Sequence, residues 1–334
     1  MTRTRSSALA VLLLVTLASA ASAAPATGPL APGIQAFEAR RFEEARKFFA
    51  PYAAAHPQDA DAAYYLGRTL AALRQTDDAI AWLEKAAKLA PRRSDVQLWL
   101  ARAYGTAAQQ ASLLRKGGLA KNAHEAWLKA VELDPGNLDA RSDLITFYLV
   151  APGFMGGSVE KAREQAGEIA KRDAVRGAIA RANIALDQKD PAAAERIVQE
   201  ALAKHPGEPQ LRNSLGLFYQ SQKRWDAAFD VYEAMLAADP DAWNALYQIG
   251  RTAALSGKRL DRGAAALQRY LGHTPDSESP PLANAHYRLG MIFEKQGNKA
   301  GARAEYQAAI KLDPKLDDAR DALKKLASPD ARGR

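Results

Sequence analysis

The sequence of 334 residues contains no cysteine. This absence excludes disulfides, thiolate zinc sites, a cysteine nucleophile and a lipid-modified cysteine at the amino terminus. β-Branched residues are scarce, whereas alanine supplies much of the 48% of the residues that are hydrophobic. That composition excludes a wholly disordered chain and favours helices over strands.

Common enzyme motifs are also missing: His-Glu-x-x-His, Gly-x-Ser-x-Gly, Gly-x-x-x-x-Gly-Lys and Gly-x-Gly-x-x-Gly do not occur. Ser158 to Lys161 matches Ser-x-x-Lys, but its companion motifs are absent, so Ser158 is predicted to be a helix N-cap. The five histidines do not group, and the net charge of +8 is spread without an arginine-rich run. We therefore expect no enzyme activity, no cofactor, no metal site and no nucleic-acid partner.

Residues 1–23 have the features of a secretory signal peptide. Arg3 and Arg5 precede an apolar run of 11 residues from Ala8 to Ala18, and Ala21 to Ala23 fits a cleavage site. The run is too short to span a bilayer, and no later segment is apolar enough to do so. We expect secretion through the general secretory pathway and a periplasmic product with no transmembrane segment after cleavage.

Prolines recur with a regular spacing. Pro57 and Pro91 are 34 residues apart, and so are Pro206 and Pro240. This period is typical of helix-turn-helix repeats.

Residues 60–93 show the pattern of one repeat. An apolar face with the spacing of a helix is formed by Ala63, Leu66, Gly67 and Leu70. A second apolar stripe is formed by Ala79, Leu83 and Ala86. Thr76 and Asp77 are predicted to form the turn and N-cap between the two helices, and Pro91 to end the second one.

The same pattern returns along the chain. Repeat position 8 is usually small and holds Gly33, Gly67, Ala101, Ile145, Ala182, Gly216, Gly250 and Gly290. Position 20 holds Ala45, Ala79, Ala123, Ala162, Ala194, Ala228, Gly263 and Ala302. Position 24 is large except at Ala166, and holds Phe49, Leu83, Trp127, Val198, Tyr232, Leu267 and Tyr306. Position 32 is proline in seven of eight repeats, with Ala174 as the exception.

These positions resemble those of the tetratricopeptide repeat (TPR) family over about residues 26–316. The resemblance implies an all-α fold, a right-handed TPR superhelix (α-solenoid) with a concave binding groove. The eight predicted repeats are 26–59, 60–93, 94–137, 138–174, 175–208, 209–242, 243–277 and 283–316. A capping helix at 317–327 and a disordered tail at 328–334 are expected to follow. Helix-packing positions hold Trp82, Trp99, Trp127 and Trp225, which we expect in the core.

Two repeats are longer than the others. Extra residues around 109–118 are expected to lengthen a helix pair, and an insert fills residues 151–157. The second insert resembles one in exported bacterial TPR proteins that have no assigned activity. Phe154 and Met155 in it are either an exposed contact or packed back onto the neighbouring helices.

A second face of each first helix lies at positions 2, 5, 9 and 12. By resemblance it lines the groove, and its candidate binding residues are Tyr64, Arg68, Arg102, Arg176, Asn183, Asn213, Asn244, Tyr247, Arg251, Asn284 and Tyr287. Guanidinium and amide groups suit carboxylates and peptide backbones, so an extended peptide with some acidic character is expected to bind. The alternative is that the arginines pair with Asp61, Asp95 and neighbouring acids. The carboxylate-clamp pattern of the family is not matched, because Ile179 and Ser214 replace its lysine and second asparagine.

The sequence therefore predicts a periplasmic, non-enzymatic scaffold that binds a protein or peptide, with envelope assembly or secretion as its context by analogy with the family. The alternative function is binding of a cell-envelope polymer, such as peptidoglycan or an anionic glycan. The identity of the partner and the oligomeric state stay open.

Overall fold

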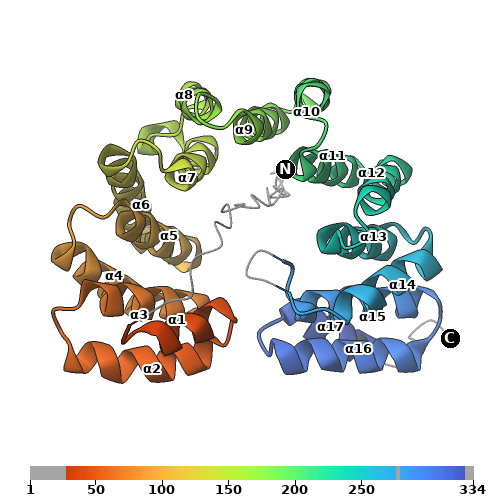
Figure 1. Cartoon of the computed structure of the whole chain (residues 1–334), viewed down its shortest axis with the longest axis horizontal. Helices are drawn as coiled ribbons and strands as arrows, with labels where there is room; N and C mark the ends of the chain where they lie inside the picture. The colour runs from red at the N-terminus through yellow and green to blue at the C-terminus, as the bar shows by residue number, and fades with distance from the viewer. Residues whose placement is uncertain (1–27, 276–278, 328–334) are drawn as a thin grey trace, which may run out of the picture. The chain divides into compact units, whose positions relative to one another are not determined.

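The structure is a computed structural model that describes residues 28–275 and 279–327, so the predicted signal peptide and tail lie outside it. The described residues are all-α, with seventeen α-helices and one 3₁₀ helix (Figure 1). The bounds are α1 Ala31–Glu38, α2 Phe42–Ala55, α3 Ala60–Ala72, α4 Thr76–Leu89, α5 Ser94–Gln110, α6 Leu113–Leu133, α7 Leu138–Val150, η1 Gly153–Met155, α8 Val159–Ala170, α9 Ala174–Asp187, α10 Pro191–Lys204, α11 Pro209–Ser221, α12 Trp225–Ala238, α13 Trp243–Ser256, α14 Leu260–Leu271, α15 Leu282–Lys295, α16 Lys299–Leu312 and α17 Asp317–Ala327.

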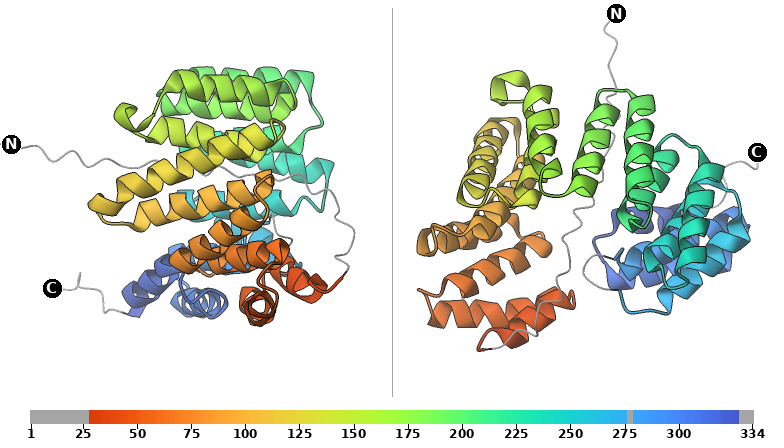
Figure 2. Two further views of the ribbon diagram at one scale, coloured as in Figure 1. Left: turned by 90° about the vertical axis from the view of Figure 1, so that its left-hand side faces the viewer. Right: turned by 45° about the horizontal axis from the view of Figure 1, so that its top comes forward.

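The helices form two compact units, one ending at Ala194 and one beginning at Glu195. In the first unit each helix contacts the next from α1 to α9, and the first helices of adjacent repeats also meet, as α3 meets α5. These helices lie over one another in a stack (Figure 2). In the second unit each helix contacts the next from α11 to α17, and α13 also meets α15. The helix pairs confirm the predicted repeat architecture.

Within a repeat the two helices approach so closely that position 8 has no room for a side chain. A Cβ built on Gly216 would lie 2.4 Å from the ring of Tyr232, the residue at position 24 of the same repeat. The glycines at position 8 of four other repeats show the same conflict with their own position 24. The large residue at position 24 is fully buried as a result.

One repeat reverses this arrangement. Ile145 at position 8 and Ala166 at position 24 are both buried in one cluster. The large residue therefore stands on the first helix here and the small one on the second, which conserves the volume between them. This exchange explains why Ala166 departs from the sequence pattern.

The prolines end the second helices as predicted. The residue before Pro57 has φ −122° and ψ 68°, and the residue before Pro135 has φ −139° and ψ 98°. A residue that precedes proline is sterically excluded from the helical region. The helices therefore stop two residues before the proline, at Ala55 and Leu133.

The turn between the two helices differs from the prediction for Thr76 and Asp77. Thr76 is already the first residue of α4, and its N-cap Gln75 makes no side-chain capping bond. Arg74 takes the left-handed conformation with φ 60°, and the amide of Gln75 donates to the carbonyl of Leu70 at 2.9 Å. The turn is therefore formed by the carboxy-terminal end of α3, not by an N-cap of α4.

The first insert lengthens both helices of its pair, to 17 residues in α5 and 21 in α6. The first helix of the first repeat, α1, has only 8 residues, and Pro32 stands in its first turn. The tryptophan prediction is confirmed for Trp127, which is buried, and for Trp82 and Trp99, which pack against the core clusters. Trp82, Trp99 and Trp225 are half-buried.

The close approach can be tested with two glycine substitutions. We expect Gly216→Ala to cost about 1–3 kcal/mol, because its new methyl group would overlap Tyr232. Gly167→Ala is the control, since Gly167 lies in α8 with nothing within 4 Å of its Cβ position. It should gain roughly 0.5–1 kcal/mol from lower backbone entropy. Chemical denaturation measures both, and equal effects would contradict the packing account.

Candidate functional site

The predicted binding residues lie on the first helices of their repeats and differ in accessibility. Those that are half-buried are Arg68, Arg102, Arg176, Asn183, Asn244, Arg251, Asn284 and Tyr287. Tyr64, Asn213 and Tyr247 are only 5%, 7% and 6% exposed. Neighbouring side chains bury these three residues almost completely, so little of their surface is left for a ligand. They support the binding face instead.

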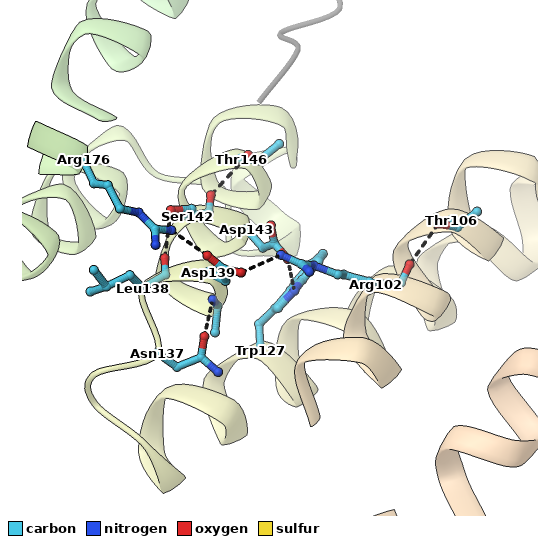
Figure 3. A network of polar contacts seen from close by, with 11 residues as sticks. Arg102, Thr106, Trp127, Asn137, Leu138, Asp139, Ser142, Asp143, Thr146 and Arg176 are labelled. Atoms are coloured by element: carbon cyan, nitrogen blue, oxygen red, sulfur yellow. Dashed lines mark hydrogen bonds and ion pairs between the residues drawn. The ribbon is translucent and has the colours of Figure 1, made fainter. Parts of the chain in front are cut away.

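In the first unit Arg102 and Arg176 are held by carboxylates of α7 (Figure 3). Arg102 donates from Nε to Asp143 at 2.6 Å and lies 3.8 Å from Asp139. Arg176 approaches Asp139 from the other side, at 2.6 Å. Trp127 donates its indole hydrogen to Asp143 at 3.2 Å. This acid–base ladder crosses three repeats and already uses both arginines.

Burial raises the pKa of Asp143, against the opposing effect of Arg102. The cost of removing Asp143 from water therefore offsets part of the favourable ion-pair energy of the ladder. Removal of one side chain of the ladder would still leave its partner charged, poorly hydrated and without an opposite charge.

Arg68 has a different environment. Its guanidinium carbon lies 4.5 Å from the ring centre of Trp99, 4.6 Å from Phe37, 5.1 Å from Tyr64 and 5.4 Å from Tyr65. No described residue accepts a hydrogen bond from it, and its Nε is buried without a partner. Asp61 and Asp95, the alternative partners, are both taken by Arg93. The rings fix the guanidinium in place by cation–π contact and leave its donors unused.

In the second unit, amide side chains link neighbouring first helices. Asn244 donates to Asn213 at 2.9 Å. Gln220 donates to Thr252 at 2.8 Å and to the Gln248 side chain at 3.3 Å. These buried amides fix the spacing of α11 and α13.

The sequence reasoning missed repeat position 6. This position holds Tyr65 and Trp99 beside Arg68, Asp143 in the ladder, Gln248 in the amide cluster, and Arg288. A signal for it was present, because position 6 lies four residues after position 2 and three before position 9.

The second insert is a tight turn that presents Phe154. The amides of Met155 and Gly157 donate to the carbonyl of Pro152 at 2.9 and 3.1 Å. Only glycine fits at Gly157, where a Cβ would lie 1.8 Å from the carbonyl oxygen of Ala151. Phe154 is 90% exposed, whereas Met155 is half-buried. Ser158 closes the turn as an N-cap by accepting from the amide of Lys161, as predicted.

Comparison with known proteins identifies the family. Models described as tetratricopeptide repeat match residues 36–103, 179–242, 230–280 and 283–316. The chain belongs to the tetratricopeptide repeat family, whose members generally mediate protein–protein interaction on a typically non-catalytic scaffold. The four matched ranges leave out both inserts. No curated protein matches the chain significantly.

Solved structures share the fold at low sequence identity. A monomeric mutant of IFIT1 with m7Gppp-AAAA is 16% identical, with a TM-score of 0.51, and the match covers 88% of this chain and 70% of that one. A TPR protein from Parabacteroides merdae is 15% identical, with a TM-score of 0.48 and coverage of 80% and 99%. A TPR protein of Thermus thermophilus is 21% identical, with a TM-score of 0.40 and coverage of 72% and 97%.

Two searches of the described residues were negative. They contain no group of His, Asp and Glu side chains arranged to hold a metal ion. Among the helices in that part of the chain, none has the length and apolarity needed to cross a membrane.

The ladder can be tested at its shared acceptor. We expect Asp143→Ala to destabilise the protein by about 1–3 kcal/mol, because it leaves Arg102 and Trp127 without their acceptor. Glu125→Ala is the control, since its pair with Lys121 is exposed at 3.7 Å and is worth about 0.3–0.5 kcal/mol. A loss at Asp143 no larger than at Glu125 in urea unfolding would show that the ladder adds nothing.

The exposure of Phe154 predicts that stability will not depend on it. Phe154→Ala should change the free energy of unfolding by less than about 0.5 kcal/mol. Phe147→Ala should cost about 2–4 kcal/mol, because that ring stacks on His124 at 4.4 Å and packs on Trp127. A large loss for Phe154→Ala would mean that the turn packs back onto the helices.

Proposed function

We propose that the protein is an exported scaffold of the periplasm that binds an extended peptide with acidic character on its first-helix faces, without catalysis. The interaction role follows from the family, and the acidic preference is argued from the side chains. Envelope assembly or secretion is the context we propose.

The observation that carries the proposal is the state of Arg68. A guanidinium fixed by four rings loses little further entropy on binding, and its donors pair with no carboxylate of the described residues. Carboxylates are its best acceptors, since charged hydrogen bonds of this kind are about twice as strong as neutral ones. Arg102 and Arg176 support the face instead, because the ladder already uses them.

The test is capture of the partner in the compartment proposed. The chain is expressed with its own leader and a carboxy-terminal tag in a bacterial host, crosslinked in the periplasm, and purified. We expect a processed chain starting at Ala24 that retains one or two envelope proteins. Arg68→Gln should reduce this capture about tenfold or more, because a charge-assisted contact is lost.

Arg92→Gln is the matched control, because Arg92 is exposed in the same unit and makes no described contact. It should leave capture unchanged. An unprocessed chain in the cytoplasm would contradict export. Sedimentation with purified sacculi but without protein partners would favour the polymer-binding alternative instead.

A further inference from the structure

Several partly buried arginines of this protein are paired with carboxylates. Arg102 and Arg176 share the ladder of the first unit. In the second unit Arg262 makes a two-pronged pair with Glu233, with both distances 2.8 Å. The exposed Arg224 also binds a carboxylate, that of Glu195, at 2.7 Å. The pairing is expected, because a cation removed from water needs an opposite charge or strong acceptors.

Arg251, on the face of α13, is one of the arginines without such a pair. It donates to the side-chain oxygen of Gln220 and has no carboxylate partner among the residues that the structure describes. The amide group of Gln220 donates to Thr252 and Gln248, so its oxygen is turned toward Arg251. A neutral acceptor thus orients the guanidinium and leaves its charge uncompensated.

Arg288, on the adjacent helix α15, is a second unpaired cation. Its Nη1 contacts the sulfur of Met291 at 3.2 Å, a weak acceptor. Its Nε is buried without a partner, and its guanidinium lies 5.0 Å from the ring centre of Tyr287. No carboxylate of the described residues pairs with it.

The two arginines act on each other. Burial lowers the pKa of Arg251, and the charge of Arg288 lowers it further. They stand on helices α13 and α15, which contact each other, and two like charges without a carboxylate partner raise the free energy of the empty face. The buried hydroxyl of Tyr232, which also interacts electrostatically with Arg251, has no hydrogen-bond partner either.

Two acids, Glu294 and Asp318, act on the neighbouring Tyr287 but do not pair with these arginines. Glu294 accepts a hydrogen bond from Tyr306 at 2.7 Å. Asp318 on α17 acts on the hydroxyl of Tyr287, where it raises the pKa in the same direction as burial, the larger cause. Neither acid makes an ion pair with Arg251 or Arg288.

We propose that Arg251 and Arg288 form a carboxylate-binding site, with Gln220 orienting Arg251 and Tyr287 flanking Arg288, for an acidic peptide bound on the second unit. A carboxylate between the two guanidiniums would supply the missing counter-charge and relieve their repulsion. This proposal rests on the proposed peptide-binding function and specifies a carboxylate as the group that is bound. A side-chain carboxylate and a free peptide terminus would serve equally.

The test measures binding of labelled peptides by fluorescence anisotropy to the secreted full chain. The probes are acetyl-(Glu-Ala)₃-amide, acetyl-(Gln-Ala)₃-amide and acetyl-(Gln-Ala)₃ with a free terminal carboxylate. We expect binding of the first, the third or both, weakened by salt, and at least tenfold weaker binding of the neutral second peptide. The first and third peptides separate side-chain from terminal carboxylates.

Arg251→Gln and Arg288→Gln should each weaken binding about ten- to a hundredfold. Arg303→Gln, which removes the same charge from an exposed site in the same unit, should not. The melting temperature of the first two variants should stay equal or rise, because an unpaired buried cation is removed. Arg288→Lys keeps the charge without the planar fork and should recover part of the affinity.

Unchanged affinity in both Gln variants, or an equal loss in Arg303→Gln, would overturn the site. If Arg68→Gln then still abolished partner capture, the proposed function would stand without it. Absence of binding to either acidic peptide would also overturn the site, and absence of any captured partner would overturn the function with it.

Discussion

The distance between the two helices of a repeat determines what the rest of the structure can do. Glycine at position 8 lets the large residue at position 24 pack against bare backbone, as Gly216 does with Tyr232. This contact fixes how each first helix is rotated, and so which of its side chains face away from the partner helix. Where the volumes are exchanged, Ile145 and Ala166 are still buried in one cluster.

That rotation brings positions 2, 6 and 9 of neighbouring first helices together within each unit. The resulting contacts are of two kinds. In the ladder Asp139 and Asp143 compensate Arg102, and the face is stabilised by its own charges. At Arg68, and at Arg251 with Arg288, the cations are held by rings and amides and have no counter-charge within residues 28–275 and 279–327. Stability and binding thus use the same positions with different neighbours.

The sequence predicted what the repeat period controls: helix pairs, proline stops, small and large packing positions, and the longer α5 and α6. Prediction from the sequence failed for features that are set by residues packed nearby in the folded structure. The turn at Thr76 depends on the left-handed Arg74 rather than on a cap. Asp143 lies 41 residues from Arg102, and one sequence cannot say which acid of the next repeat will reach a given arginine. Arg288 was missed because position 6 was not counted with the binding face.

The most direct test of this account is the nuclear magnetic resonance spectrum of the arginine Nε–H groups during titration with acetyl-(Glu-Ala)₃-amide. The signals of Arg68, Arg251 and Arg288 should shift with increasing peptide, because their guanidiniums lack a carboxylate in the free protein. Those of Arg102 and Arg176 should not, because the ladder already occupies them. Equal shifts for all five arginines, or shifts confined to the ladder, would contradict the claim that uncompensated cations define the binding faces.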